Sequence, residues 1–259
     1  MKIDVLGVKV NADTKNTILF LIKKLLGENR RVFIVTPYSE TIVKAQIDDE
    51  FKGVLNSADF SLPDGIGVVW AAHFLKRFMI YDLGFRKIFG LISTLKSIIL
   101  NPKSIYDPIP EKISGSEFVW DLARLAAERG YSVFLLGGFG DTPRLAAANL
   151  KSKFPNLNIA GTANEIPETI NADFLFVALG PVRQEKWIAA NISRLPIKLA
   201  IGLGGTFDYL AGKRAPAPHF WAVRGLEWLW RLLTQPWRLW RISKGIPGLI
   251  YHAFKVKIQ

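Results

Sequence analysis

Short apolar runs alternate with longer amphipathic segments along most of the chain, and this alternation restricts the fold more than any other feature. Five runs rich in Val, Ile, Leu and Phe predict strands: Val32–Thr36, Asp59–Leu62, Ser132–Leu136, Phe174–Leu179 and Lys198–Leu203. Six segments with helical periodicity predict helices: Thr14–Glu28, Glu40–Phe51, Ile66–Lys76, Ser116–Glu128, Thr142–Phe154 and Arg183–Ile192. The expected N-caps are Asp13 with Thr14, Ser39, and Asp141 with Thr142. Strand–helix alternation favours a doubly wound, mostly parallel sheet, which binds ligands at the carboxyl ends of its strands. We therefore expect a Rossmann-like α/β fold.

Three segments lie outside this alternation. Ile3–Val10 predicts a small flanking strand or hairpin arm. Phe78–Leu100 is strongly apolar and has one helical face, which would either pack in the core or lie on a bilayer as a basic amphipathic helix. We expect a core over residues 1–212, with this apolar insertion around 78–107. A helical, Trp- and Arg-rich appendage should follow over residues 213–259, with Pro236 dividing it into two helices.

Positive charge is concentrated toward the C-terminus. The formal net charge is +12, and the residues from Pro196 onward hold ten Lys and Arg against two acidic side chains. Five Trp side chains lie among these cations, and Trp favours the bilayer interface, where its body is apolar and its N–H stays wet. We therefore expect the appendage to bind an anionic membrane surface rather than nucleic acid.

Other features of the composition bear on the location of the protein. The chain has no cysteine, which excludes disulfides and thiolate chemistry and fits a reducing compartment. Its first residues carry no signal-peptide pattern, and no apolar run is long enough to span a bilayer. We expect a cytoplasmic protein, peripheral on the inner face of the plasma membrane.

Two glycine turns that follow predicted strands indicate phosphate binding. Gly137 and Gly138 follow one strand, and Gly204 and Gly205 follow another. Glycine lets backbone N–H groups approach a phosphate without side-chain obstruction. Neither turn has the G-x-G-x-x-G spacing of a dinucleotide site, which argues against the alternative of a nucleotide-dependent oxidoreductase.

Polar side chains also fall at predicted strand ends. Thr36 ends one strand, and Asp64 lies in a Pro-Asp-Gly turn with Gly65, before a helix. Asp64 is either an N-cap for that helix or a general base that points into the cleft. Gln184 lies in the first turn of a later helix, where its amide either orients sugar or phosphate oxygens or belongs to an ordinary capped helix.

No metal or cofactor is expected. The chain has no D-x-D sequence, and its three histidines lack the spacing of metal ligands. The charge of a departing diphosphate would then be met by guanidinium groups and backbone N–H groups, and Arg214, Arg231 and Arg238 of the appendage are the candidates. A non-enzymatic module that binds anions of a membrane or nucleic acid stays open as an alternative.

Taken in order, these motifs resemble the WecG/TagA/CpsF family of bacterial glycosyltransferases, glycosyltransferase family 26. The matching blocks are spread in order over most of the chain: Ala58–Phe60 with Pro63–Gly67, Ile113–Glu117, Phe134–Gly138, Ala178–Trp187, Gly202–Asp208, Arg214–Pro216 and Gly225–Leu232. Two positions differ from the usual pattern of the family: Tyr38 stands in place of Asn, and Lys112 in place of Arg.

The resemblance implies an inverting, metal-independent enzyme of cell-envelope polysaccharide or teichoic acid synthesis. It would transfer N-acetylmannosamine, or a related hexose or uronate, from a UDP donor to a polyprenyl-diphosphate-linked sugar. The catalytic acid of the family maps to Asp64, the motif Gln to Gln184, and the tail arginines to Arg231 and its neighbours. UDP would lie near the two glycine turns, with Asp208 toward uridine or ribose. The resemblance also makes a homo-oligomer plausible.

Overall fold

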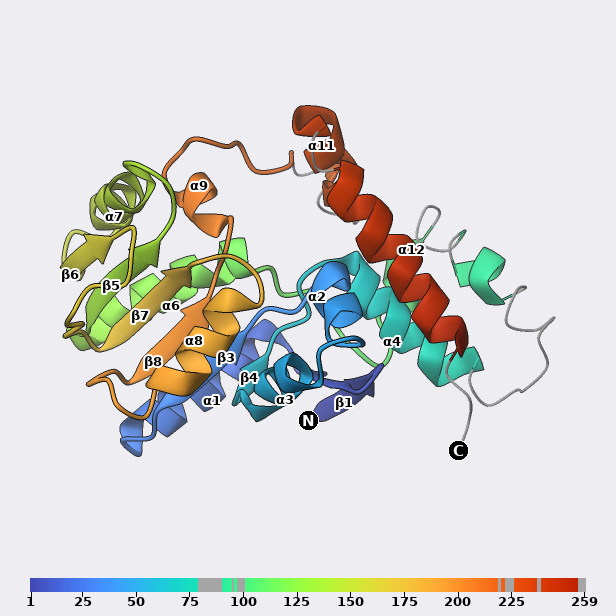
Figure 1. Cartoon of the computed structure of the whole chain (residues 1–259), viewed down its shortest axis with the longest axis horizontal. Coiled ribbons are helices and arrows are strands. Elements are labelled where there is room, and N and C mark those ends of the chain that lie inside the picture. Colours follow the sequence, from blue (N-terminus) through green and yellow to red (C-terminus); the bar gives the residue numbers. More distant parts are fainter. Residues whose placement is uncertain are drawn as a thin grey trace.

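The centre of the molecule is a six-stranded sheet in the order β4-β3-β8-β7-β5-β6 (Figure 1). The computed structural model describes residues 1–78, 90–94, 96, 101–218, 220–221, 226–236 and 239–255. All neighbouring strands of this sheet run parallel, which confirms the predicted α/β class. The strands are β3 (Val32–Val35), β4 (Phe60–Ser61), β5 (Ser132–Gly137), β6 (Asn158–Ala163), β7 (Phe174–Ala178) and β8 (Leu199–Gly202).

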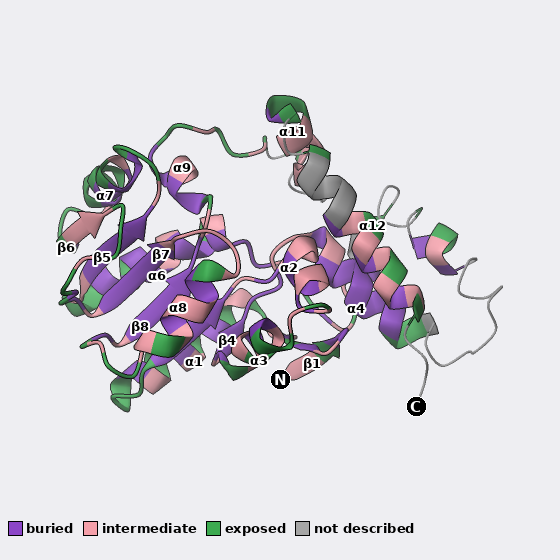
Figure 2. Ribbon diagram, viewed as in Figure 1, coloured by how far each residue is buried: buried purple, intermediate pink, exposed green. Residues whose placement is uncertain are grey.

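Helices cover both faces of the sheet, because successive strand residues point to opposite sides and nearly all of them are apolar. Val32 and Ile34 of β3 belong to one buried cluster, and Phe33 and Val35 belong to the other. The first cluster is closed by α1 (Lys15–Gly27), α6 (Gly115–Arg129), α7 (Thr142–Lys153) and α9 (Thr206–Leu210). The second is closed by α2 (Ser39–Lys44), α3 (Asp49–Ser57), α4 (Ile66–Phe78) and α8 (Arg183–Asn191). Figure 2 shows β5, β7 and β8 as a buried layer between these helices, whereas the edge strand β6 is only partly buried.

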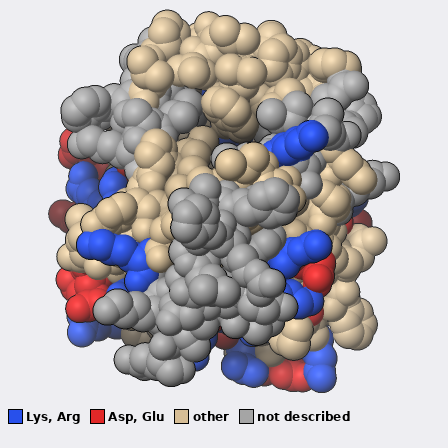
Figure 3. All heavy atoms as spheres, turned by 90° about the vertical axis from the view of Figure 1, so that its right-hand side faces the viewer, with Lys and Arg blue, Asp and Glu red and all other residues tan. Residues whose placement is uncertain are grey.

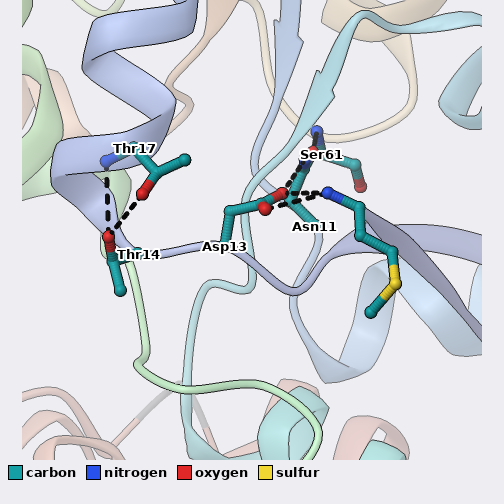
Figure 4. Close-up of polar contacts among 6 residues, drawn as sticks. Asn11, Asp13, Thr14, Thr17 and Ser61 are labelled. Atoms are coloured by element: carbon teal, nitrogen blue, oxygen red, sulfur yellow. Dashed lines mark hydrogen bonds and ion pairs between the residues drawn. The ribbon is translucent and has the colours of Figure 1, made fainter.

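A separate antiparallel hairpin, β1 (Lys2–Val5) with β2 (Val8–Asn11), lies beside the edge strand β4. Its last residue reaches across to the sheet: the backbone N–H of Ser61 donates to Asn11 Oδ1 at 2.8 Å (Figure 4). The amide of Asn11 donates in turn to Asp13 Oδ2 at 3.1 Å. This contact satisfies a backbone donor on the sheet edge and fixes β4 just before the turn that carries Asp64.

Two helix-boundary predictions were wrong. The predicted helix Glu40–Phe51 is two helices, α2 and α3, because Asp48 caps the second one and accepts from the backbone N–H of Phe51 at 2.8 Å. Ser39 is the first residue of α2 rather than its N-cap. In contrast, Thr14 caps α1 as expected and accepts from the backbone N–H of Thr17 at 3.3 Å (Figure 4).

The sequence also failed to predict one strand. The edge strand β6 was missed because all of its residues except Ile159 are small or polar and none of them is fully buried.

The C-terminal segment forms α11 (Glu227–Thr234) and α12 (Leu239–Lys255), separated near Pro236 as predicted. Helix α12 lies against α2 and α4 (Figure 1). Glycine permits this close approach, since a Cβ atom on Gly245 would stand 3.3 Å from the backbone nitrogen of Glu40, and one on Gly248 would stand 3.1 Å from Val43. The domain boundary near residue 212 stays a prediction.

Part of the 78–107 insertion and of the appendage lies outside the described residues. Within the insertion, Thr94 is buried and accepts from the indole N–H of Trp70 at 2.9 Å, whereas Ile92 is exposed. A short 3-10 helix, η1 (Pro102–Ile105), follows. Most of Phe78–Leu100, for which the sequence predicts either core packing or a position on a bilayer, lies outside the described residues.

Candidate active site

A cavity of about 530 Å³ lies at the carboxyl ends of β3, β4 and β8, where an α/β sheet binds its ligands. The sheet side of the cavity is formed by residues that directly follow these strands: Thr36, Asp64, Gly65, Gly204 and Gly205. The opposite side is formed by α11 and α12, including Glu227, Arg231 and Ile246. The structure therefore brings together seven of the predicted site residues, Gln184 and Arg231 included.

The turn that carries Asp64 is held by backbone hydrogen bonds to two other segments. The N–H of Asp64 donates to the carbonyl of Pro37 at 3.0 Å, and the N–H of Ile113 donates to the carbonyl of Pro63 at 3.0 Å. Gly65 has a φ of +97°, which a residue with a Cβ rarely adopts. The position of the carboxylate is thus set by main-chain geometry at the sheet edge.

The carboxylate of Asp64 contacts a helix, but not the one that follows it in sequence. Its Oδ2 accepts a long hydrogen bond, 3.4 Å, from the N–H of Gly115, the first residue of α6. Thr36 packs beside this contact, since a Cβ on Gly115 would stand 3.3 Å from the Thr36 methyl group. Asp64 also lines the cavity, so the carboxylate remains in reach of a ligand.

The surroundings of Asp64 raise the pKa of its carboxyl group. Burial is the largest cause, because it penalises the charged form, and the negative charge of Glu227 acts in the same direction. Arg231, the N–H of Gly115 and Lys112 pull the pKa down, in that order, without cancelling the effect of burial. A carboxylate with a raised pKa is a better proton acceptor than an ordinary aspartate.

Helix α11 brings the cationic side of the site. Arg231 lines the cavity and lies with its guanidinium carbon 5.4 Å from the ring centre of Tyr209. One turn earlier, Glu227 forms an ion pair with Lys112 at 2.5 Å. The two side chains of this pair are only 18% and 11% exposed. This largely buried pair joins the start of α11 to the loop that precedes α6.

Both the oxygen and the nitrogen of the Gln184 side-chain amide form hydrogen bonds within the protein. Its Oε1 accepts from the backbone N–H of Gly204 at 3.0 Å, and its Nε2 donates to Glu185 Oε1 at 2.7 Å. Glu185 in turn accepts from the N–H of Val182 at 2.7 Å, and burial raises the pKa of its carboxyl group. A Cβ on Gly202 would stand 2.9 Å from Gln184 Nε2, so the strand end must be glycine for this amide to fit. Gln184 thereby fixes the glycine turn after β8.

Thr36 supports the same turn from the neighbouring strand. Its hydroxyl donates to the carbonyl of Gly202 at 3.1 Å, which ties the end of β3 to the end of β8. Gly204 has a φ of +49°. The backbone of this turn is therefore held by two side chains, one on each side of β8.

Of the predicted site residues that the structure describes, four do not line the cavity: Gly137, Gly138, Asp208 and Arg214. Gly137 is needed for close strand packing, because a Cβ there would stand 2.5 Å from the carbonyl group of Ala178. Gly138 packs against Phe207 of α9. Asp208 is paired with Arg214 at 3.0 Å. Arg238 lies outside the described residues.

Sequence reasoning missed the residues that attach α11 to the core. Glu227 was noted only as part of a family block and Lys112 only as a departure from the family pattern, although Glu227 stands one helical turn before Arg231 and that spacing places both on one face. Tyr209 was also missed. Its hydroxyl is buried and has no hydrogen-bond partner among the described residues. The guanidinium group of Arg231 lies over its ring.

A parallel α/β sheet with a cavity at the carboxyl ends of its strands is the arrangement of an α/β protein that binds a ligand there. The model of the glycosyl transferase WecG/TagA/CpsF family matches residues 3–83 and 96–259, and the chain belongs to this family. An N-acetylglucosaminyldiphosphoundecaprenol N-acetyl-beta-D-mannosaminyltransferase from Bacillus spizizenii is 30% identical over 256 residues, 95% of this chain and 88% of the relative. A protein of the same name from Staphylococcus aureus is 26% identical over 268 residues, 99% of this chain and 93% of the relative.

Proposed function

We propose that the chain transfers N-acetylmannosamine, or a related hexose or uronate, from a UDP donor to a sugar linked to polyprenyl diphosphate, with inversion and without a metal ion. Family membership supports sugar transfer. The names of two relatives, which describe N-acetylmannosaminyl transfer to a diphosphoundecaprenol-linked N-acetylglucosamine, support the class of acceptor and the donor sugar. The observation that carries the proposal is Asp64, a carboxylate of raised pKa that lines the cavity and is influenced by Arg231.

In the proposed reaction, Asp64 acts as the general base. The acceptor hydroxyl gives its proton to the carboxylate while its oxygen attacks the anomeric carbon from the face opposite UDP. The bond between that carbon and the phosphate oxygen breaks, and UDP leaves with the bonding electrons. Arg231 would stabilise negative charge on the leaving diphosphate or hold the diphosphate of the acceptor. Arg214 and Arg238 would belong to the same cationic arm.

The donor would lie across the strand ends. The turn of Gly204 and Gly205 offers backbone N–H groups to a phosphate, and Gln184 and Thr36 would keep that turn in shape. Gly137 and Gly138 end a strand on the same edge of the sheet. Asp208 would contact uridine or ribose only if its pairing with Arg214 opened.

We propose that the protein acts at the cytoplasmic face of the plasma membrane. The appendage would dock on the membrane, and the protein would have no nucleic acid partner. Leu233 on α11 and Leu239 on α12 are largely exposed, which is the exposed apolar surface that such docking needs. Figure 3 shows this end of the molecule, with Lys and Arg side chains on both sides and uncharged residues over its upper part. Among the described residues, the helices are each too short or too polar to cross a membrane.

The test is a panel of UDP-sugars with a short-chain prenyl-diphosphate-N-acetylglucosamine acceptor, read by product mass and anomeric configuration. We expect one β-linked disaccharide product in the presence of EDTA. Asp64→Asn should lose transfer and keep UDP binding, measured by thermal shift, whereas Asp49→Asn, on an exposed residue of α3, should keep both. Wild-type turnover by Asp64→Asn would refute the assignment of the base.

A further inference from the structure

The cavity has a second wall whose chemistry differs from that of the sheet side. Beyond Asp64, the lining residues of α4 and α12 are apolar, with Ile66 and Trp70 on α4 and Ile246, Leu249 and Ile250 on α12. A nucleotide and a sugar are polar over most of their surface, so this wall does not match the donor. An apolar wall in the same cavity as a proton acceptor fits a ligand that joins a sugar to a hydrocarbon.

The apolar residues of α12 differ in how far they are buried. Leu249 and Ala253, one turn apart, are each 1% exposed and pack in the core cluster on α2 and α4. Ile246 and Ile250, also one turn apart, keep part of their surface open, and both line the cavity. The residues that hold α12 in place and those that keep surface open toward the cavity therefore lie on adjoining faces of the helix, and Leu249 and Ile250 contribute to both the packing and the lining.

The position of the apolar wall is fixed by the packing of α12 against α2 and α4. Gly245 brings the backbone of α12 close to that of α2, since a Cβ there would stand 3.3 Å from the nitrogen of Glu40. On the α4 side, Trp70 stacks on Phe74 with ring centres 5.2 Å apart, and Phe254 stacks on the same Phe74 at 5.4 Å. Both helices are thus locked together by packing behind the cavity.

We propose that the wall formed by α4 and α12 binds the isoprenoid units next to the diphosphate of the acceptor, a proposal that rests on the proposed function. The order of groups in such an acceptor is hydroxyl-bearing sugar, diphosphate and hydrocarbon. The cavity offers a matching set: Asp64 for the hydroxyl, Arg231 for the diphosphate, and Ile246 with Ile250 for the hydrocarbon. Trp228, which comes from α11 like Arg231, lines the same cavity and packs against the same core cluster.

The experiment compares acceptors that share one head group, N-acetylglucosamine diphosphate, and carry a methyl, geranyl or farnesyl chain. All are used in solution without vesicles, so membrane docking does not contribute. With the wild-type protein we expect the KM for acceptor to fall stepwise from methyl to farnesyl, because each isoprene unit removes apolar surface from water. The KM for the UDP-sugar should stay the same along the series.

The matched variants place polar side chains on two faces of α12, the face that lines the cavity and the exposed face. Ile246→Ser with Ile250→Ser should raise the KM for the farnesyl acceptor by on the order of tenfold and leave a much smaller effect on the methyl acceptor. Tyr251→Ser, on an exposed residue of the same helix, should keep the wild-type chain-length dependence. Ile246→Trp, which fills the cavity without removing apolar surface, is the second probe if the double variant does not fold.

The outcomes separate the two proposals. A wild-type KM that is independent of chain length, or an equal loss on the methyl and farnesyl acceptors in the double variant, would overturn the isoprenoid site while leaving sugar transfer intact. No transfer to any acceptor from any UDP-sugar by the wild-type protein would instead overturn the proposed function itself. Steeper chain-length dependence in the wild type than in the double variant supports the site.

Discussion

The two sides of the cavity are built by different means. On the sheet side, Asp64 is placed by main-chain hydrogen bonds that come from the packing of β3, β4 and α6. On the other side, Arg231 lies on α11, an eight-residue helix whose start is joined to the core by the ion pair between Glu227 and Lys112. We infer that the proposed base is preformed by the fold, whereas its cationic partner depends on side-chain contacts and can be displaced separately.

The largest expected effect comes from the sheet side. Asp64→Asn should lower transfer by about 10²–10⁴-fold, the usual contribution of a general base. Because burial holds the pKa of Asp64 above its ordinary value, wild-type transfer should rise with pH through that raised pKa and then level off. The residual activity of the variant should lack this rise. A pH–rate profile of both proteins at saturating substrates checks the prediction, and identical profiles would contradict it.

Breaking the attachment of α11 should have the next largest effect. Lys112→Met leaves Glu227 as a largely buried charge without its partner, which costs up to about 3–5 kcal/mol in comparable pairs. We expect lower stability in urea unfolding and a fall in transfer, since Arg231 loses its anchor, but little change in UDP binding if the sheet side is independent.

The control for this pair is the double variant Lys112→Met with Glu227→Met. Because no buried charge is then left alone, it should be destabilised less than the sum of the two single variants. If transfer returned to the wild-type level in the double variant, α11 would not need the ion pair, and the contrast between the two sides would be weaker than we infer.

Asp64 should also lower the stability of the free protein near neutral pH. Its pKa is raised in the folded state, so the folded protein favours the protonated form. Stability is then greatest below the unfolded pKa, about 3.9, and falls as the pH rises toward the folded pKa. Asp64→Asn should therefore raise Tm at pH 7, by about 2–4 °C for each kcal/mol gained, and should give no gain near pH 3. Thermal unfolding at the two pH values tests this, and an equal gain at both would rule out ionisation as the cause.

The sequence predicted the sheet side of the cavity better than the side formed by α11. The sheet side was predictable because each of its parts is local: an apolar run predicts a strand, and the Pro-Asp-Gly turn at Asp64 and the glycines at 204 and 205 follow such runs directly. The role of Gln184 was less accessible, because its partner Gly204 lies in the turn after the next strand, β8, and only the fold brings the two residues together. The pair of Lys112 and Glu227 has no local pattern at all, since the two residues are far apart in the sequence.

The smallest expected effect concerns the second attachment of the arm. Arg214 is bonded to Asp208 at 3.0 Å and to Gln235 at 3.0 Å, so it joins α9 to the segment after α11. Its side chain is 29% exposed and that of Asp208 is 26% exposed. Water therefore screens this pair more than the pair of Lys112 and Glu227, and pairs at the surface contribute about 0.2–1 kcal/mol.

Arg214→Met should thus lower the free energy of unfolding by no more than about 1 kcal/mol. If Arg214 serves only as an attachment, transfer should fall in proportion to that loss, and Asp208→Asn should have the same effect. If Arg214 instead clamps a diphosphate, its substitution should raise the KM for one substrate while Asp208→Asn leaves that KM unchanged or lowers it, because the guanidinium is then released. Urea unfolding together with KM values for both substrates separates the two roles.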